Sequence, residues 1–296
     1  MKETVFTGAA TAIITPLDEN GVDYGKFEEL IEWQIKEGID AIVVAGTTGE
    51  GSTLTDEEHR EVIKFAVEKV NGRVPVIAGT GSNDTDYALN LAKYACEGGA
   101  DALLVVTPYY NKATQKGLVK MFNQIAEVST KPIILYNVPS RTGVNITPAT
   151  CKELSKNPKI VAIKEASGNM SQIAEIAALC GDDLDIYSGN DDQIVPVMSL
   201  GGKGVISVLS NLLPKETSAI CHDFLNGNVK ESRAKQLEYL DLINALFCEV
   251  NPIPVKSAMS YMGYCENYLR LPLTPMEEDN EKKLYALMEQ AGIRRK

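Results

Sequence analysis

Eight short runs of mainly apolar and β-branched residues constrain the fold of this chain more than any other feature of its sequence. They cover residues 10–15, 41–45, 74–79, 102–107, 132–137, 160–165, 184–189 and 204–208. Their apolar residues are nearly continuous, which predicts strands covered on both faces, as in parallel sheets. From the second run onward the starts are 20 to 33 residues apart, so each step has room for one strand and one crossover helix.

The segments between these runs have the pattern of amphipathic helices. Residues 24–37 carry Phe27, Leu30 and Ile31 at helical spacing. Thr55, followed by Glu58 three residues later, has the spacing of a capping box and predicts the start of another helix. Eight strand–helix units favour a closed (β/α)8 TIM barrel over an open doubly wound α/β sheet, which usually has fewer strands.

Further helices are predicted after the eighth run, at residues 213–227, 229–250, 254–262 and 275–291. The first of these completes the barrel, and the others form a C-terminal helical appendage. Because no Gly/Ser-rich linker separates the appendage, we expect a catalytic barrel at residues 1–227 with a helical region at residues 228–296 packed on it.

Composition and charge exclude several classes of function. The 29 basic and 40 acidic residues give a net charge of −11, and the basic block 294–296 is too short to neutralise many phosphates, so no nucleic-acid binding is expected. The N-terminus is not signal-like and no apolar stretch is long enough to span a membrane, which predicts a cytoplasmic protein. Six scattered cysteines without a C-x-x-C pair and only two histidines argue against a metal centre, and the chain contains no complete nucleotide-binding glycine motif.

In a barrel of this type, catalytic residues lie at the C-terminal ends of the strands and in the loops that follow. Lys164 is the sharpest signal there, because lysine is rare inside a strand that otherwise consists of Ile, Val and Ala. Burial disfavours the charged ammonium, and the neutral amine can attack a ketone to form a Schiff base. The alternative is a structural lysine paired with an acid such as Glu165.

Three other positions at the same barrel end have plausible chemical roles. Tyr136 can act as a general acid or base, the Thr47-Thr48 turn offers hydroxyl and backbone N–H groups to a carboxylate, and Arg141 can bind a carboxylate through two parallel hydrogen bonds. Taken singly, each also has an ordinary structural interpretation. His59 and His222 are predicted to be structural or solvated.

Four motifs together identify the chain as similar to the dihydrodipicolinate synthase family. They are Gly46-Thr47-Thr48-Gly49-Glu50, Thr107-Pro108-Tyr109-Tyr110-Asn111-Lys112, Leu135-Tyr136-Asn137-Val138-Pro139-Ser140-Arg141-Thr142-Gly143 and Ile163-Lys164-Glu165-Ala166. The resemblance runs from Gly8 to the C-terminal helices. It implies a metal-independent class I aldolase-type lyase that condenses pyruvate with L-aspartate 4-semialdehyde in lysine and diaminopimelate biosynthesis, with no cofactor apart from a covalent pyruvate imine on Lys164.

The resemblance also implies a role for each matched residue. Lys164 forms the imine, Tyr136 is the central proton carrier, and Thr47 and Tyr110 complete the proton relay. Tyr110 is expected to reach into the site of a neighbouring subunit of a homotetramer built as a dimer of dimers. The backbone at Thr47 and Thr48 would hold the pyruvate carboxylate and Arg141 the carboxylate of the semialdehyde. Gly189 and Ile206 would line the pocket through their backbones.

Three alternatives remain from the sequence. N-acetylneuraminate lyases and keto-deoxy-sugar-acid aldolases share the fold and the Schiff-base lysine, but Arg141 and the Thr47-Thr48 pair argue against them. The sialic-acid lyases have a Ser-Thr version of that turn. They generally lack the arginine, since their second substrate is an uncharged sugar aldehyde. A catalytically silent barrel that binds a keto acid would need Arg141 but not Lys164.

Feedback inhibition by L-lysine is predicted to be weak or absent. Asn83, His59 and Tyr109 match the pattern of lysine-inhibited relatives, whereas Asp56 and Tyr87 stand where that pattern has a histidine and an acid, and 51–52 is Gly-Ser instead of Ser-Ala. A steady-state assay with increasing L-lysine measures this directly. Half-inhibition at millimolar lysine or below would contradict the prediction.

Overall fold

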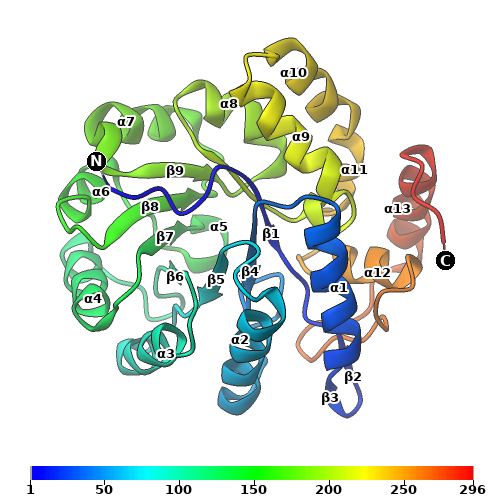
Figure 1. The fold of residues 1–296 in the computed structure, drawn as a ribbon, viewed down its shortest axis with the longest axis horizontal. Helices are drawn as coiled ribbons and strands as arrows, with labels where there is room; N and C mark the ends of the chain where they lie inside the picture. Colours follow the sequence, from blue (N-terminus) through cyan, green and yellow to red (C-terminus); the bar gives the residue numbers. More distant parts are fainter. Residues whose placement is uncertain (1, 296) are drawn as a thin grey trace.

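Eight parallel strands close into a barrel in the computed structural model, which describes residues 2–295. The strands are β1 (Gly8–Ala12), β4 (Ala41–Val44), β5 (Val76–Gly79), β6 (Ala102–Val106), β7 (Ile133–Asn137), β8 (Ile160–Glu165), β9 (Asp185–Ser188) and β10 (Gly204–Ser207). Strand β1 pairs with both β10 and β4, which closes the ring. The predicted TIM barrel is therefore confirmed (Figure 1).

Helices surround the barrel and continue beyond it. They are α1 (Tyr24–Lys36), α2 (Asp56–Val70), α3 (Thr85–Glu97), α4 (Gln115–Val128), α5 (Pro139–Thr142), α6 (Pro148–Leu154), α7 (Met170–Cys180), α8 (Ile194–Ser199), α9 (Pro214–Leu225), α10 (Val229–Glu238), α11 (Leu240–Ala245), α12 (Ile253–Tyr261) and α13 (Glu278–Gln290). Figure 1 shows α12 and α13 on one side of the molecule, beyond α1. Within residues 2–295, no helix is both long and apolar enough to cross a bilayer.

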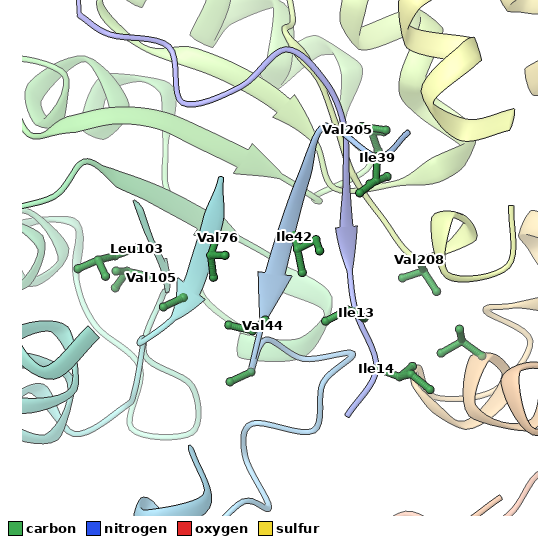
Figure 2. Packing of buried hydrophobic residues seen from close by; sticks show 14 of the residues in the cluster. Ile13, Ile14, Ile39, Ile42, Val44, Val76, Leu103, Val105, Val205 and Val208 are labelled. Atoms are coloured by element: carbon green, nitrogen blue, oxygen red, sulfur yellow. The ribbon is translucent and has the colours of Figure 1, made fainter. Parts of the chain in front are cut away.

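Side chains alternate between two cores along each barrel strand. In β4, Ile42 and Val44 pack in the layer between strands and helices, whereas Ala41 and Val43 point into the barrel. Figure 2 shows this outer layer on β4 and on β6, where Leu103 and Val105 contribute. Both faces of each strand are thus buried in apolar surroundings, which explains why the strands are near-continuously apolar in sequence.

The structure corrects two predicted boundaries. The first strand is Gly8–Ala12 and not residues 10–15, because the backbone N–H of Ile14 donates to the Asn211 side chain and not to a neighbouring strand. The helix predicted at residues 229–250 is divided into α10 and α11 at Tyr239 and ends at Ala245. A small antiparallel hairpin of β2 (Leu17–Asp18) and β3 (Gly21–Val22) was not predicted, since two-residue strands leave no periodicity to detect.

The C-terminal region packs against the first two helices of the barrel. The rings of Trp33 and Tyr264 stack with their centroids 4.6 Å apart. At the start of α2 the predicted capping box is present: Thr55 Oγ1 accepts from the Glu58 backbone N–H, and the Thr55 N–H donates to Glu58 Oε2. Arg270 donates to both carboxylate oxygens of Glu58, each at 2.6 Å. These hydrogen bonds hold the pKa of Glu58 at about 2, below its ordinary 4.5.

Replacement of Glu58 by Gln is therefore expected to destabilise the protein in a pH-dependent way. The carboxylate has a lower pKa in the folded state, so its contribution is fully present above pH 4.5 and is lost as the pH falls toward 2. We expect a loss of about 1 kcal/mol at pH 7 for this partly exposed pair. Urea unfolding at several pH values measures the difference, which should shrink below pH 4.5.

Glu57→Gln is the matched control, because it removes the same charge from the same helical turn without touching Arg270. A Glu58→Gln effect that is equal to the Glu57→Gln effect, or that does not change with pH, would contradict the assigned role of Arg270.

Candidate active site

Lys164 and Tyr136 lie side by side in the interior of the barrel. Ala162 faces the interior, and the two-residue period of strand β8 places Lys164 on the same face. The parallel register of β7 and β8 sets Tyr136 opposite Lys164, and the Lys164 Nζ lies 4.3 Å from the centroid of the Tyr136 ring. Both side chains are buried. An amine and a phenol therefore meet inside the barrel.

Glu165 does not pair with Lys164. It accepts hydrogen bonds from the side chains of Asn137 and Gln172 and from the backbone N–H of Ser167. Among residues 2–295, no carboxylate lies within ion-pair distance of the Lys164 Nζ. The structural interpretation that paired Lys164 with Glu165 is wrong, and the amine is left available for a ligand.

Asp191 is a buried acid in this region that the sequence patterns did not single out. Its Oδ2 accepts from the backbone N–H groups of Val208 and Leu209, and its Oδ1 has no hydrogen-bond partner within the described chain. Burial raises the pKa of Asp191, while hydrogen bonds and the charge of Lys164 act in the opposite direction. Only its place directly after β9, at the catalytic end of the barrel, could have identified it.

The Thr47-Thr48 turn follows β4 and has a tightly constrained backbone. Glu50 N–H donates to Thr47 O, and Gly51 N–H donates to Gly46 O. A Cβ on Gly51 would lie 2.2 Å from the carbonyl oxygen of Ala45, so only glycine fits there. The buried Thr48 accepts a hydrogen bond from Asn251 Nδ2 at 3.0 Å.

Arg141 lies on the short helix α5, at the mouth of the same barrel end. Its Nη2 donates to the backbone carbonyl of Asn251 at 3.0 Å, and the rest of the guanidinium is exposed. Asn251 thus contacts both Thr48 and Arg141. It was not identified from the sequence, because it precedes α12 in the C-terminal region and carries no strand-end signal.

A cavity of about 440 Å³ brings several predicted residues together. Thr47, Tyr136 and Arg141 all line it, as do Tyr87 and Tyr109. The volume is within the range of sites that bind small molecules.

Gly189 and Ile206 are not among the residues that line this cavity. A Cβ on Gly189 would lie 3.2 Å from Lys164 Cε and 2.6 Å from Ala166 Cβ, so the glycine gives the lysine its space. Ile206 is fully buried in the inner core with Tyr136.

Two predicted catalytic residues are not among those that line the cavity. Lys164 lies in the barrel interior beside Tyr136, whereas Tyr110 points away from the barrel. The Tyr110 side chain is 93% exposed and its φ is +66°, a left-handed conformation that non-glycine residues rarely adopt. The loop is held to the segment that precedes α3, because Asn111 Nδ2 donates to Asn83 O and Asn83 Nδ2 donates to Tyr109 O. The ring is thus held outward on an ordered loop.

The two histidines do not form a ligand cluster. The buried His59 makes a 2.7 Å hydrogen bond from Nε2 to Gly79 O, and burial lowers its pKa. His222 pairs with Asp40 at 2.8 Å. The part of the chain that the structure describes contains no group of three or more His, Cys, Asp or Glu side chains arranged to hold a metal ion.

Comparisons with known proteins identify the family of this chain. Residues 5–291 match the model of the dihydrodipicolinate synthetase family. A protein of Acetivibrio thermocellus named 4-hydroxy-tetrahydrodipicolinate synthase is 58% identical over 293 residues, which span 99% of this chain and 100% of the relative. A protein of Clostridium perfringens with the same name is 59% identical over 276 residues, spanning 93% and 95% of the two chains.

Solved structures give the same result. The dihydrodipicolinate synthase of Aquifex aeolicus superimposes with a TM-score of 0.97 at 46% identity, covering 98% of this chain and 100% of the other. A structure described as the first monomeric dihydrodipicolinate synthase variant has a TM-score of 0.96 at 40% identity and covers 98% of both chains. With a family match over nearly its whole length, the chain belongs to the dihydrodipicolinate synthetase family.

Proposed function

We propose that this enzyme condenses pyruvate with L-aspartate 4-semialdehyde to give 4-hydroxy-tetrahydrodipicolinate, in lysine and diaminopimelate biosynthesis. The observation that carries the proposal is the buried Lys164, which forms no ion pair within residues 2–295 and lies beside Tyr136, a residue of the cavity whose wall includes Arg141. The names of relatives at 58% identity over the whole chain support the same activity.

The reaction begins at Lys164. Its neutral amine attacks the ketone carbon of pyruvate, and loss of water gives an iminium that serves as the electron sink, so the covalent imine replaces any further cofactor. Loss of a methyl proton then gives an enamine, whose carbon attacks the aldehyde of the second substrate. The amine of that substrate finally displaces Lys164 from the imine carbon and closes the ring.

Tyr136 carries the protons in this sequence, because its ring lies against the Lys164 amine. Thr47, on the cavity wall, connects Tyr136 to the Tyr110 of a neighbouring subunit and completes the relay. Relay groups on three separate segments require a precise assembly, which we propose the oligomer provides.

Two carboxylate sites orient the substrates. The backbone N–H groups of Thr47 and Thr48 bind the carboxylate of pyruvate, and the backbones of Gly189 and Ile206 line the same pocket. Arg141 binds the carboxylate of the semialdehyde, since its guanidinium is anchored by one hydrogen bond to Asn251 and otherwise free to form a two-pronged contact.

We further propose a cytoplasmic homotetramer built as a dimer of dimers. The outward ring of Tyr110 supports at least a dimer, because a ring that is 93% exposed on a hydrogen-bonded loop is accessible to another subunit. Within each subunit, residues 1–227 form the catalytic barrel and residues 228–296 form the helical region packed on it.

Replacement of Arg141 by Ala tests the substrate assignment. Loss of a two-pronged charged contact should lower kcat/KM for the semialdehyde roughly 100-fold or more, while the KM for pyruvate changes little. Steady-state kinetics with each substrate varied in turn separates the two effects. Arg73→Ala, which removes a surface arginine paired with Glu32, is the matched control and should behave as the unchanged protein.

The same assay separates this function from that of a sugar-acid lyase. The unchanged protein should consume pyruvate with aspartate semialdehyde and not with N-acetylmannosamine. Turnover with the sugar alone would overturn the proposed function, and equal losses for both substrates in Arg141→Ala would contradict the role of Arg141.

Subunit mixing tests the shared site. Tyr110→Phe and Arg141→Ala subunits are each expected to be impaired, but a mixed dimer holds one site with both residues intact. Random exchange should therefore restore about a quarter of the sites of the unchanged protein. Activity measured before and after exchange checks this, and no recovery between subunits shown to have mixed would contradict a site completed by the neighbour.

A further inference from the structure

A fully buried ion pair lies directly behind the Thr47-Thr48 turn and has no part in the mechanism above. Glu50 Oε1 and Lys256 Nζ are 2.7 Å apart, and both side chains are 0% exposed. Glu50 ends the motif that carries the two threonines, whereas Lys256 lies in α12 of the C-terminal region. The pair therefore connects the catalytic end of the barrel to a helix more than 200 residues away in sequence.

The ammonium of Lys256 restrains the turn in two ways. It contacts Glu50 directly, and it donates a 2.7 Å hydrogen bond to the carbonyl oxygen of Thr15. The hydroxyl of Thr15 in turn donates to the carbonyl oxygen of Gly49, also at 2.7 Å. Both connections end on the two residues that immediately follow Thr48.

The backbone of this turn needs such restraint. Ala45 and Glu50, which flank it, have φ values of +52° and +55°. Non-glycine residues in this region cost free energy and persist only where the surroundings hold them in place. A buried charge separated from its partner is strongly unfavourable, so the ion pair keeps Glu50 in this conformation.

We propose that Glu50 and Lys256 are positioning residues that set the turn for catalysis. Through the pair, α12 holds the backbone N–H groups of Thr47 and Thr48 toward the pyruvate carboxylate and the Thr47 hydroxyl toward Tyr136. This inference rests on the proposed function. It gives the C-terminal region a part in catalysis in addition to its packing on the barrel.

The distribution of contacts favours positioning over simple attachment. The C-terminal region also reaches the barrel through the Trp33–Tyr264 stack, which does not touch the turn. Arg270 pairs with Glu58 and donates its backbone N–H to Glu50 Oε2 at 3.4 Å, so a second group of the C-terminal region meets Glu50. Well-packed apolar residues would hold α12 in place at least as well as a buried ion pair. The buried charges are therefore better explained by orientation of the Thr47-Thr48 turn than by attachment of α12 to the barrel alone.

The variants that test this are Lys256→Met, Glu50→Gln and the double variant, each measured at a temperature well below its own unfolding midpoint. The double variant leaves no unpaired charge in the core, so it separates loss of positioning from the cost of a buried charge. We expect it to keep a cooperative thermal transition, with at least a 10-fold rise in the KM for pyruvate and at least a 10-fold fall in kcat.

Trp33→Leu is the matched control, because it weakens another contact of the C-terminal region without affecting the turn. Its kcat and KM should stay within 3-fold of the values of the unchanged protein, even if its unfolding midpoint falls as far as that of the double variant. Normal kcat and KM in the folded double variant would overturn the proposal, as would equal losses in Trp33→Leu.

Thr15→Val gives a second test that does not depend on the folding of the charge variants. It removes the hydrogen bond to Gly49 with little change in volume. The KM for pyruvate should rise several-fold, and an unchanged KM and kcat would count against the positioning role. Absence of turnover in the unchanged protein would instead overturn the proposed function itself.

Discussion

The register between β7 and β8 places Tyr136 opposite Lys164, and the rest of the site depends on that pairing. A lysine inside an apolar barrel is costly unless it is paired or has a chemical use. Here its Nζ lies over the face of the Tyr136 ring, 4.3 Å from the centroid. The neighbouring acid, Glu165, is occupied by Asn137, Gln172 and Ser167, which leaves the amine facing the interior.

Much of the barrel could be predicted from the sequence because its strands are buried on both faces. That burial makes each strand a continuous apolar run, and the crossover helices fix the spacing between runs. The first strand was misplaced because Ile13 and Ile14 extend the apolar run beyond the sheet. Whether a backbone group pairs with a strand or with the side chain of Asn211 depends on a contact between distant parts of the chain, which local patterns do not carry.

The candidate site also contains some residues that local sequence patterns indicate and others that only contacts between distant parts of the chain bring into place. Lys164 and Tyr136 lie at the ends of strands, and Thr47 and Arg141 lie just after strands, so the sequence could place these candidates at one end of the barrel. Their supporting residues could not be placed in this way. Asn251 and Lys256 belong to the C-terminal region and reach the Thr47-Thr48 turn or its flanks only after the chain has folded back on the barrel.

The proposed reaction depends on a covalent bond between pyruvate and Lys164, which mass spectrometry can detect. Borohydride reduces an imine to a stable amine, so protein treated with pyruvate and borohydride should gain one reduced pyruvyl group per subunit. Peptide mapping should place it on Lys164, and prior addition of aspartate semialdehyde should consume the intermediate. An unmodified protein, or an adduct on another lysine, would contradict the central role assigned to Lys164.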